Sequence, residues 1–135
     1  MANALYTAYK QLILGAGLNL SSGDVKLVIT DHGTDTPNVA TDDFLNDISA
    51  GTVGSASGNF TTKTITGGVF DADDVVLTAV SGASCESINV FHDSGSAATS
   101  ELIVYFDTGT NIPFTPNGGD ITISWDSGTN KVFKL

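Results

Sequence analysis

Apolar and polar residues alternate strictly in the segment that begins at Asp120. The apolar positions are Ile121, Ile123 and Trp125, and the polar positions between and after them are Thr122, Ser124 and Asp126. A period of two predicts a half-buried strand. Residues 126–130 then have turn composition and residues 131–135 that of a returning strand, so we expect a closing hairpin over Asp120–Leu135. Its predicted core-facing residues are Ile121, Ile123, Trp125, Phe133 and Leu135.

Further segments upstream also have strand composition. They are Val25–Thr30, Phe60–Thr66, Val75–Val80, Glu86–His92 and Leu102–Phe106. The Thr-rich run that starts at Phe60 predicts an edge or surface strand, interrupted by Gly67-Gly68. Leu102–Phe106 is apolar on both faces, which predicts a central strand that is covered on both sides.

Two short helices are predicted in the first third of the chain. Asn3 is a suitable N-cap for a helix from about Ala4 to Leu14, and Gly15 is suited to end it. Its apolar stripe consists of Leu5, Tyr9, Leu12, Ile13 and Ala16. This helix either lies across the sheet or docks on a partner protein. The second helix follows Thr41 as N-cap and buries Phe44, Leu45 and Ile48.

About seven or eight short strands at spacings of roughly 8–15 residues indicate an all-β protein. We expect one domain over residues 1–135, folded as an antiparallel β-sandwich that is jelly-roll-like. An immunoglobulin-like topology is the other candidate, but the chain lacks the cysteine pair of that fold because Cys85 is its only cysteine.

The charge balance narrows the possible partners. The 135 residues carry a net charge of −10, from thirteen Asp, two Glu, five Lys and no Arg. Asp favours turns, so the acidity is expected in loops. Without a basic cluster, direct contact with nucleic acid or an anionic membrane surface is disfavoured. No basic leader followed by an apolar run and no apolar stretch near the length of a membrane helix is present, so we expect neither a signal peptide nor a membrane span.

Three groups of residues contain side chains that can carry chemistry. His92, Asp93 and Ser94 are adjacent, but a catalytic triad is assembled from separate segments, so turn chemistry is favoured. The acidic runs at residues 71–74 and 42–47 contain the oxygen ligands that calcium prefers, yet neither matches an EF-hand loop. Solvated turn residues are the favoured interpretation, a weak cation site and a hydrolase using Asp73 and Asp74 being the alternatives. We expect no enzyme activity, cofactor or metal.

Four stretches resemble a family of small proteins encoded in the structural modules of tailed phages. They are Asn3–Gln11, Thr66–Asp71, Ala97–Ser100 and Thr115–Leu135. In size and β-content that family resembles the capsid cement, or decoration, proteins of the jelly-roll type. The resemblance implies a virion structural protein, without catalytic residues, that is made in the host cytoplasm and binds the outer surface of the major capsid protein lattice.

A cement role also implies self-association as a homo-dimer or homo-trimer, with edges and apolar loop ends paired between copies. An acidic surface without Arg suits the solvent side of a particle better than the side that faces packaged DNA. The alternative is a head-fibre or receptor-binding module that recognises glycan, although aromatic residues are sparse and Trp125 alternates onto the predicted core face. Candidate partner contacts are Tyr6, Tyr9, Lys131 and Lys134.

Overall fold

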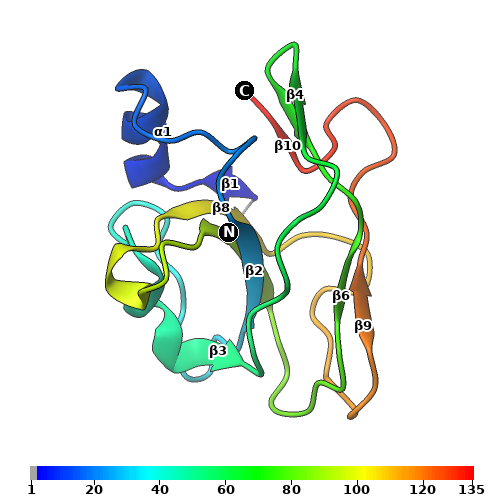
Figure 1. Ribbon diagram of the computed structural model, residues 1–135. Coiled ribbons are helices and arrows are strands. Elements are labelled where there is room, and N and C mark those ends of the chain that lie inside the picture. The colour runs from blue at the N-terminus through cyan, green and yellow to red at the C-terminus, as the bar shows by residue number, and fades with distance from the viewer. Residues whose placement is uncertain (1–2) are drawn as a thin grey trace.

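The computed structural model describes residues 3–135, and its largest sheet has five antiparallel strands in the order β1-β8-β7-β2-β3. These strands are β1 (Ala4–Leu5), β2 (Val25–Thr30), β3 (Thr52–Val53), β7 (Ser87–His92) and β8 (Leu102–Phe106). In Figure 1 this sheet runs through the middle of the molecule, between a layer that contains α1 and a layer that contains β6 and β9. Because both faces are covered, nearly every residue of β7 and β8 is buried; β8 is apolar throughout, whereas β7 also buries the polar residues Ser87 and Asn89.

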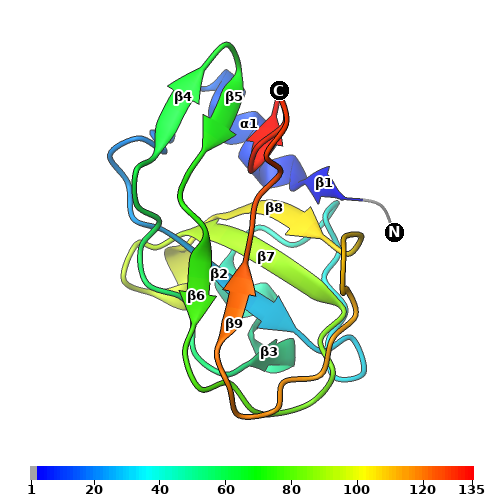
Figure 2. The same cartoon turned by 90° about the vertical axis from the view of Figure 1, so that its right-hand side faces the viewer.

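The second layer is one long ribbon made of two small sheets (Figure 2). Its strands are β4 (Thr64–Thr66), β5 (Val69–Asp71), β6 (Val75–Leu77), β9 (Ile121–Ile123) and β10 (Phe133–Lys134). Strand β10 pairs with β5, and β9 pairs with β6. Since β5 leads directly into β6, the segment from β9 to β10 runs antiparallel beside both of them.

The predicted hairpin over Asp120–Leu135 is therefore wrong. β9 and β10 do not pair with each other but follow one another along the same partner segment. Ile123 and Phe133 are ten residues apart, whereas their partners Val75 and Phe70 are five apart. The extra residues form an exposed excursion at 126–130, which leaves the ladder and returns to it.

The predicted antiparallel β-sandwich is confirmed, with 31% of the residues in strands and 13% in helices. The predicted strands that begin at Val25, Glu86 and Leu102 correspond to β2, β7 and β8. β4 is an edge strand with three exposed residues, as expected for the Thr-rich run. The jelly roll has eight strands in two sheets, whereas the described part of this chain divides its strands among sheets of five, three and two.

The N-terminal helix is shorter than predicted. It is α1 (Thr7–Leu14), followed by Gly15 as expected, while Ala4–Leu5 form β1 instead. Asn3 does not cap a helix, because its side-chain oxygen accepts hydrogen bonds from the backbone N–H groups of Asp107 and Thr108, each at 3.0 Å. These bonds hold the entry of the chain in the extended conformation beside β8.

The second predicted helix is replaced by two 3₁₀ turns, η1 (Leu45–Asp47) and η2 (Ser49–Gly51), and a third such turn, η3, spans Ala97–Thr99. Thr41 is not its cap. The Asp47 carboxylate instead accepts hydrogen bonds from the backbone N–H groups of Asp43 and Phe44, at 2.9 and 3.0 Å. Ile48 is buried as predicted, since these turns close the face of the sheet that carries α1.

A buried polar network fixes the start of α1 to the centre of the large sheet. The Tyr6 hydroxyl donates to the Asn89 side-chain oxygen at 2.6 Å, and the Asn89 amide donates to Thr30 Oγ1 at 3.1 Å. Ser87 Oγ bonds with Thr30 Oγ1 and, at 2.9 Å, with His32 Nε2. Every buried side-chain nitrogen and oxygen in residues 3–135 has a hydrogen-bond partner, so the network fixes one arrangement of β1, β2 and β7.

Removing the Tyr6 hydroxyl should be costly. We expect Tyr6→Phe to lower the free energy of unfolding by about 1–3 kcal/mol, because the Asn89 oxygen stays buried without a donor. Tyr105→Phe is the matched control, since the bond from that hydroxyl to Asp107 is longer, at 3.3 Å against 2.6 Å for Tyr6, and it should cost less. Urea unfolding followed by circular dichroism measures both values; equal losses in the two variants would contradict this assignment.

The buried tyrosines also predict loss of stability in alkali. Burial raises the pKa of Tyr9 and of Tyr105 to about 12, from an ordinary value of 10.0. Above pH 10 the unfolded chain releases these protons while the folded chain keeps them, so stability falls as the pH rises toward 12. Each tyrosine contributes a slope of up to about 1.4 kcal/mol per pH unit. Urea unfolding between pH 9 and pH 11.5 should show a shallower decline for Tyr9→Phe than for the wild type; identical declines would refute the effect.

Candidate interaction surface

An apolar groove separates α1 from the sheet of β4, β5 and β10. It has a volume of about 240 Å³. Its lining residues include Tyr9, Ile13, Leu18, Leu20, Ile65, Phe70, Phe133 and Leu135. The floor is formed by aromatic side chains: the Phe133 ring packs against Phe70 at 5.5 Å and edge-on against Tyr9 at 5.9 Å between ring centroids. This packing couples the helix to the small sheet.

The mouth of the groove is apolar and open to solvent. Leu14 at the end of α1 is 90% exposed, Leu135 is 62% exposed and Ile65 on β4 is 53% exposed. Ile65 and Leu135 line the groove, whereas Leu14 is exposed at the end of α1, outside the lining. We call these three residues the apolar rim. Ile65 shares a face with Phe70 and Phe133 because the three are in register across the sheet. With Val76 on β6, the rim accounts for all large apolar side chains that residues 3–135 expose.

The other face of the same small sheet carries two lysines. Lys131 and Lys134 line a shallow hollow together with Thr64 and Thr66. The Lys131 ammonium donates to the Ser127 carbonyl at 3.3 Å and lies 4.0 Å from the Asp71 carboxylate. The structure therefore brings together the two lysines that the sequence singled out, on the outer side of the sheet that bears the apolar rim.

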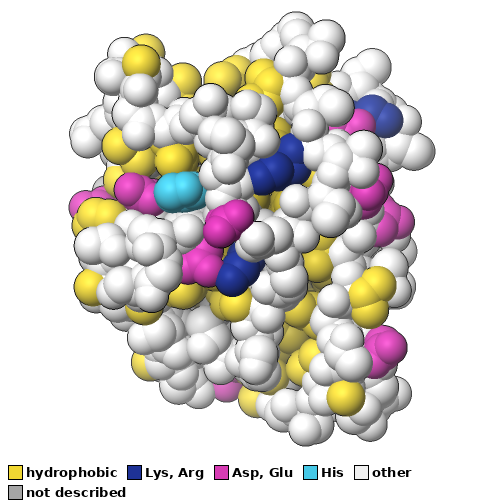
Figure 3. All heavy atoms as spheres, viewed as in Figure 1, with side chains coloured by type: hydrophobic (Ala, Val, Ile, Leu, Met, Phe, Trp, Pro, Cys, Tyr) yellow, Lys and Arg dark blue, Asp and Glu magenta, His cyan; other side chains and the backbone are white. Residues whose placement is uncertain are grey.

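Charge is distributed unevenly between this end and the rest of the molecule. The segments 7–20, 63–71 and 126–135 contain four of the five lysines but only two of the fifteen carboxylates, Asp71 and Asp126. The remainder of the chain has Lys26 and thirteen carboxylates. We call these three segments together the apolar-basic end. Figure 3 shows apolar atoms at the top of the molecule, around the ends of α1 and β4.

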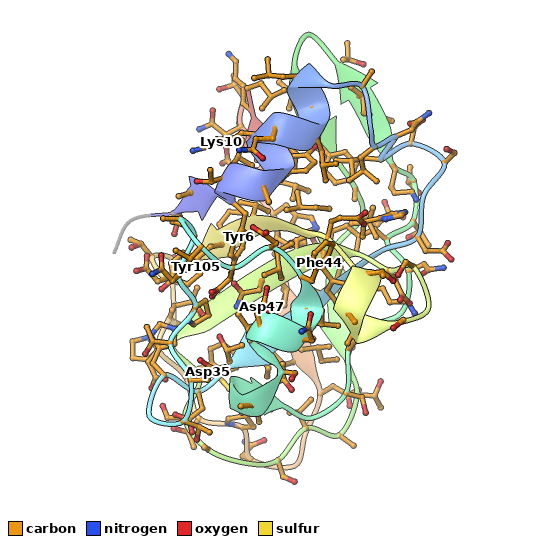
Figure 4. All side chains as sticks on the ribbon, turned by 90° about the vertical axis from the view of Figure 1, so that its left-hand side faces the viewer. Tyr6, Lys10, Asp35, Phe44, Asp47 and Tyr105 are labelled. Atoms are coloured by element: carbon orange, nitrogen blue, oxygen red, sulfur yellow. The ribbon has the colours of Figure 1, made fainter. Side chains whose placement is uncertain are left out.

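Tyr6 and Tyr9, predicted as partner contacts, are not on the surface. Figure 4 shows Tyr6 directed from the start of α1 toward the sheet, close to Tyr105. Tyr6 is fully buried and bonds to Asn89, and Tyr9 packs against Phe133. Burial raises the pKa of Tyr6 far above its ordinary value, and the nearby Asp42 carboxylate raises it further. Both tyrosines are core residues that position the groove, a role that the place of Tyr9 on the apolar stripe already indicated.

The residues around His92 do not form a triad. His92 Nδ1 bonds with Glu101 Oε2 at 2.9 Å, and the Asp93 carboxylate forms an ion pair with Lys26 at 2.5 Å. The hydrogen bond and charge of Lys26 lower the pKa of Asp93. The other histidine, His32, bonds with Ser87, but that serine is fully buried. A substrate has no access to it, so the arrangement is structural.

The acidic runs bind parts of their own chain. Asp73 accepts hydrogen bonds from the hydroxyls of Thr61 and Thr62, which lower its pKa. Asp74 accepts from Ser124 and from the backbone N–H of Trp125. No group of three or more metal-ligating side chains converges in residues 3–135. Cys85 is buried, and burial raises the pKa of its thiol to about 11.

Trp125 packs toward the interior, as its alternation predicted. Its ring lies 5.4 Å from Phe60 and 6.0 Å from Phe106 between centroids, and its indole N–H donates to the Asp73 carbonyl at 3.0 Å. The side chain therefore joins the two layers where β9 ends.

No protein-family model matches the chain, and a comparison with curated proteins gives no match either. Across residues 3–135, no helix has the length and apolar character needed to cross a bilayer.

The floor of the groove should matter for stability, but its rim should not. We expect Phe133→Ala to lower the free energy of unfolding by about 3–5 kcal/mol, because a buried ring that contacts both α1 and β5 is lost. Leu135→Ala, two residues along the same face, should change it by less than about 0.5 kcal/mol because that side chain is exposed. Chemical denaturation measures both; a large loss from Leu135→Ala would show that the rim is part of the core.

Proposed function

We propose that this chain is a non-enzymatic bacteriophage virion structural protein, a capsid cement protein that binds the outer surface of the major capsid protein lattice and stabilises the head. The observation that carries the proposal is the apolar-basic end, on an otherwise strongly acidic sandwich. The sequence resemblance to phage structural-module proteins supports the choice of partner. The proposed location is the capsid exterior, after synthesis in the host cytoplasm.

The chemistry of this end defines the surface that it fits. Exposed Leu14, Ile65 and Leu135 would be removed from water by an apolar projection on the partner. The lysines of the same end, two of which lie on the other face of the small sheet, favour a partner that carries acidic groups beyond that projection. The thirteen carboxylates elsewhere would stay in solvent, where they keep the coated particles apart.

A small contact is sufficient for a cement protein. Burying one exposed leucine contributes about 1.5–3 kcal/mol, which alone gives weak binding. Copies that each touch more than one subunit of a lattice gain from a raised effective concentration at the second contact. The proposal therefore requires a rigid body and an exposed docking end rather than a deep pocket.

The alternative function, glycan recognition by a head-fibre or receptor-binding module, finds less support. Glycan sites use aromatic rings that are open to solvent, whereas the Trp125 ring packs between Phe60 and Phe106 and its N–H is bonded within the chain. The aromatic residues of the apolar-basic end, Tyr9, Phe70 and Phe133, are buried as well.

Binding to expanded, protein-free capsid shells tests the proposal. We expect the recombinant chain to sediment with the shells and to raise the temperature at which they rupture. Leu14→Ser and Lys134→Glu should each weaken binding about tenfold or more, which corresponds to about 1.4 kcal/mol. Added salt should weaken binding further, because it screens the lysines.

Val76→Ser is the matched control, since Val76 is 51% exposed but lies on β6, outside the apolar-basic end. It should bind like the wild type. The proposal fails if the wild type ignores the shells, and the docking surface is wrong if Val76→Ser and Leu14→Ser lose binding equally.

A further inference from the structure

Strand β4 has a short free edge of three residues, and the preceding Lys63 does not cover it because its ammonium donates to the Gly23 carbonyl. It pairs only with β5, and all three of its residues are exposed. Edge strands are usually guarded against pairing with other chains by a charge, a proline or a bulge. Thr64, Ile65 and Thr66 include none of these. Figure 2 shows β4 as the outermost strand of its sheet, on the side away from β10.

The hairpin geometry shows which backbone groups face that edge. Gly67 and Gly68 form the two-residue connection, with φ of +60° and +78°, as a type I′ turn requires. In such a hairpin the pair next to the turn, Thr66 and Val69, exchanges both backbone hydrogen bonds. Pairs alternate along an antiparallel ladder, so Ile65 and its partner Phe70 form a non-bonded pair. The N–H and C=O of Ile65 therefore point away from β5, toward the open edge.

We propose that a second copy of this chain pairs with β4 across a two-fold axis centred on Ile65. The outward N–H and C=O of Ile65 in one copy would bond with those of Ile65 in the other. The two small sheets would then join into one sheet of six strands. An antiparallel pair centred on one residue is self-complementary, which is the condition for a closed dimer.

The side chains of β4 fit this register. Thr64 would lie opposite Thr66 of the second copy, a pairing that is favourable in sheets. The two Ile65 side chains would be neighbours on the face that carries the apolar rim, so the two rims would join in one apolar strip. Both Ile65 side chains would lose part of their exposure to water, since each is 53% exposed in one copy.

Charge also favours this edge over the others. Two copies of a chain with a net charge of −10 repel each other. Their repulsion is smallest where carboxylates are fewest, and the apolar-basic end has only two of the fifteen. The dimer would present the apolar-basic ends of both copies on one side. It would form in solution, without the capsid.

Charge substitution at Ile65 tests the dimer directly. In the wild type, light scattering after gel filtration should give a mass approaching twice the 13.9 kDa of the chain as the concentration rises. Ile65→Lys and Ile65→Glu should each give 13.9 kDa, because like charges would meet at the axis. An equimolar mixture of the two variants should regain the doubled mass. Val76→Lys, a matched change at another exposed edge residue, should behave like the wild type.

A backbone variant tests the hydrogen bonds separately. Proline is tolerated on an edge strand where the N–H faces solvent, so Ile65→Pro should keep the fold by circular dichroism and lose the doubled mass. Ile65→Thr retains the N–H and should still dimerise, more weakly. The proposal is overturned if the wild type stays at 13.9 kDa up to about 1 mM or forms a trimer. It is also overturned if the charged or proline variants remain dimeric. A mixture of charged variants that stays monomeric overturns the register at Ile65.

Discussion

The hydrogen bond from the Tyr6 hydroxyl to the Asn89 side chain fixes the start of α1, the helix that lines one side of the groove. Asn89 lies in β7 near the middle of the large sheet, and Tyr6 immediately precedes α1. Because Asn89 is itself bonded to Thr30, the network links β1, β2 and β7. Tyr9, three residues later in the same helix, packs against Phe133 at the floor of the groove. A buried polar cluster of this kind gives uniqueness of packing more than net stability.

Strand β8 was predictable because its apolar content is continuous, and β2 and β7 were predictable because apolar residues alternate along them. For β8 the absence of a polar face was enough to place it inside the sheet. The hairpin predicted over Asp120–Leu135 is wrong because alternation and turn composition are local properties. Residues 126–130 have the composition of a hairpin turn, yet the registers of β9 with β6 and of β10 with β5 make them an excursion. Only the distant partner strands decide between these outcomes.

The candidate surface was predictable in part for a similar reason. The two lysines near the end of the chain stood out because positive charge is rare in this sequence, and they do lie together in the structure. Tyr6 and Tyr9 were misassigned because a tyrosine is compatible with either surface or core until its hydroxyl has a known partner. The exposure of Leu14 and Ile65 depends on where α1 ends relative to β4, which is a tertiary property without a local signal. The same holds for Asn3, whose partners at residues 107 and 108 are more than a hundred positions away.

The excursion at residues 126–130 connects β9 to β10, and the registers of these two strands do not depend on its length. Before the excursion β9 pairs with β6, and after it β10 pairs with β5. The Asp126 carboxylate closes the excursion by accepting hydrogen bonds from the backbone N–H groups of Gly128 and Asn130. All five residues are exposed. Added residues at Ser127–Gly128 would leave both registers in place, since neither depends on the other through this loop. The chain thus has a position at which a foreign peptide could be carried without a change to the fold, next to the face that bears Lys131 and Lys134.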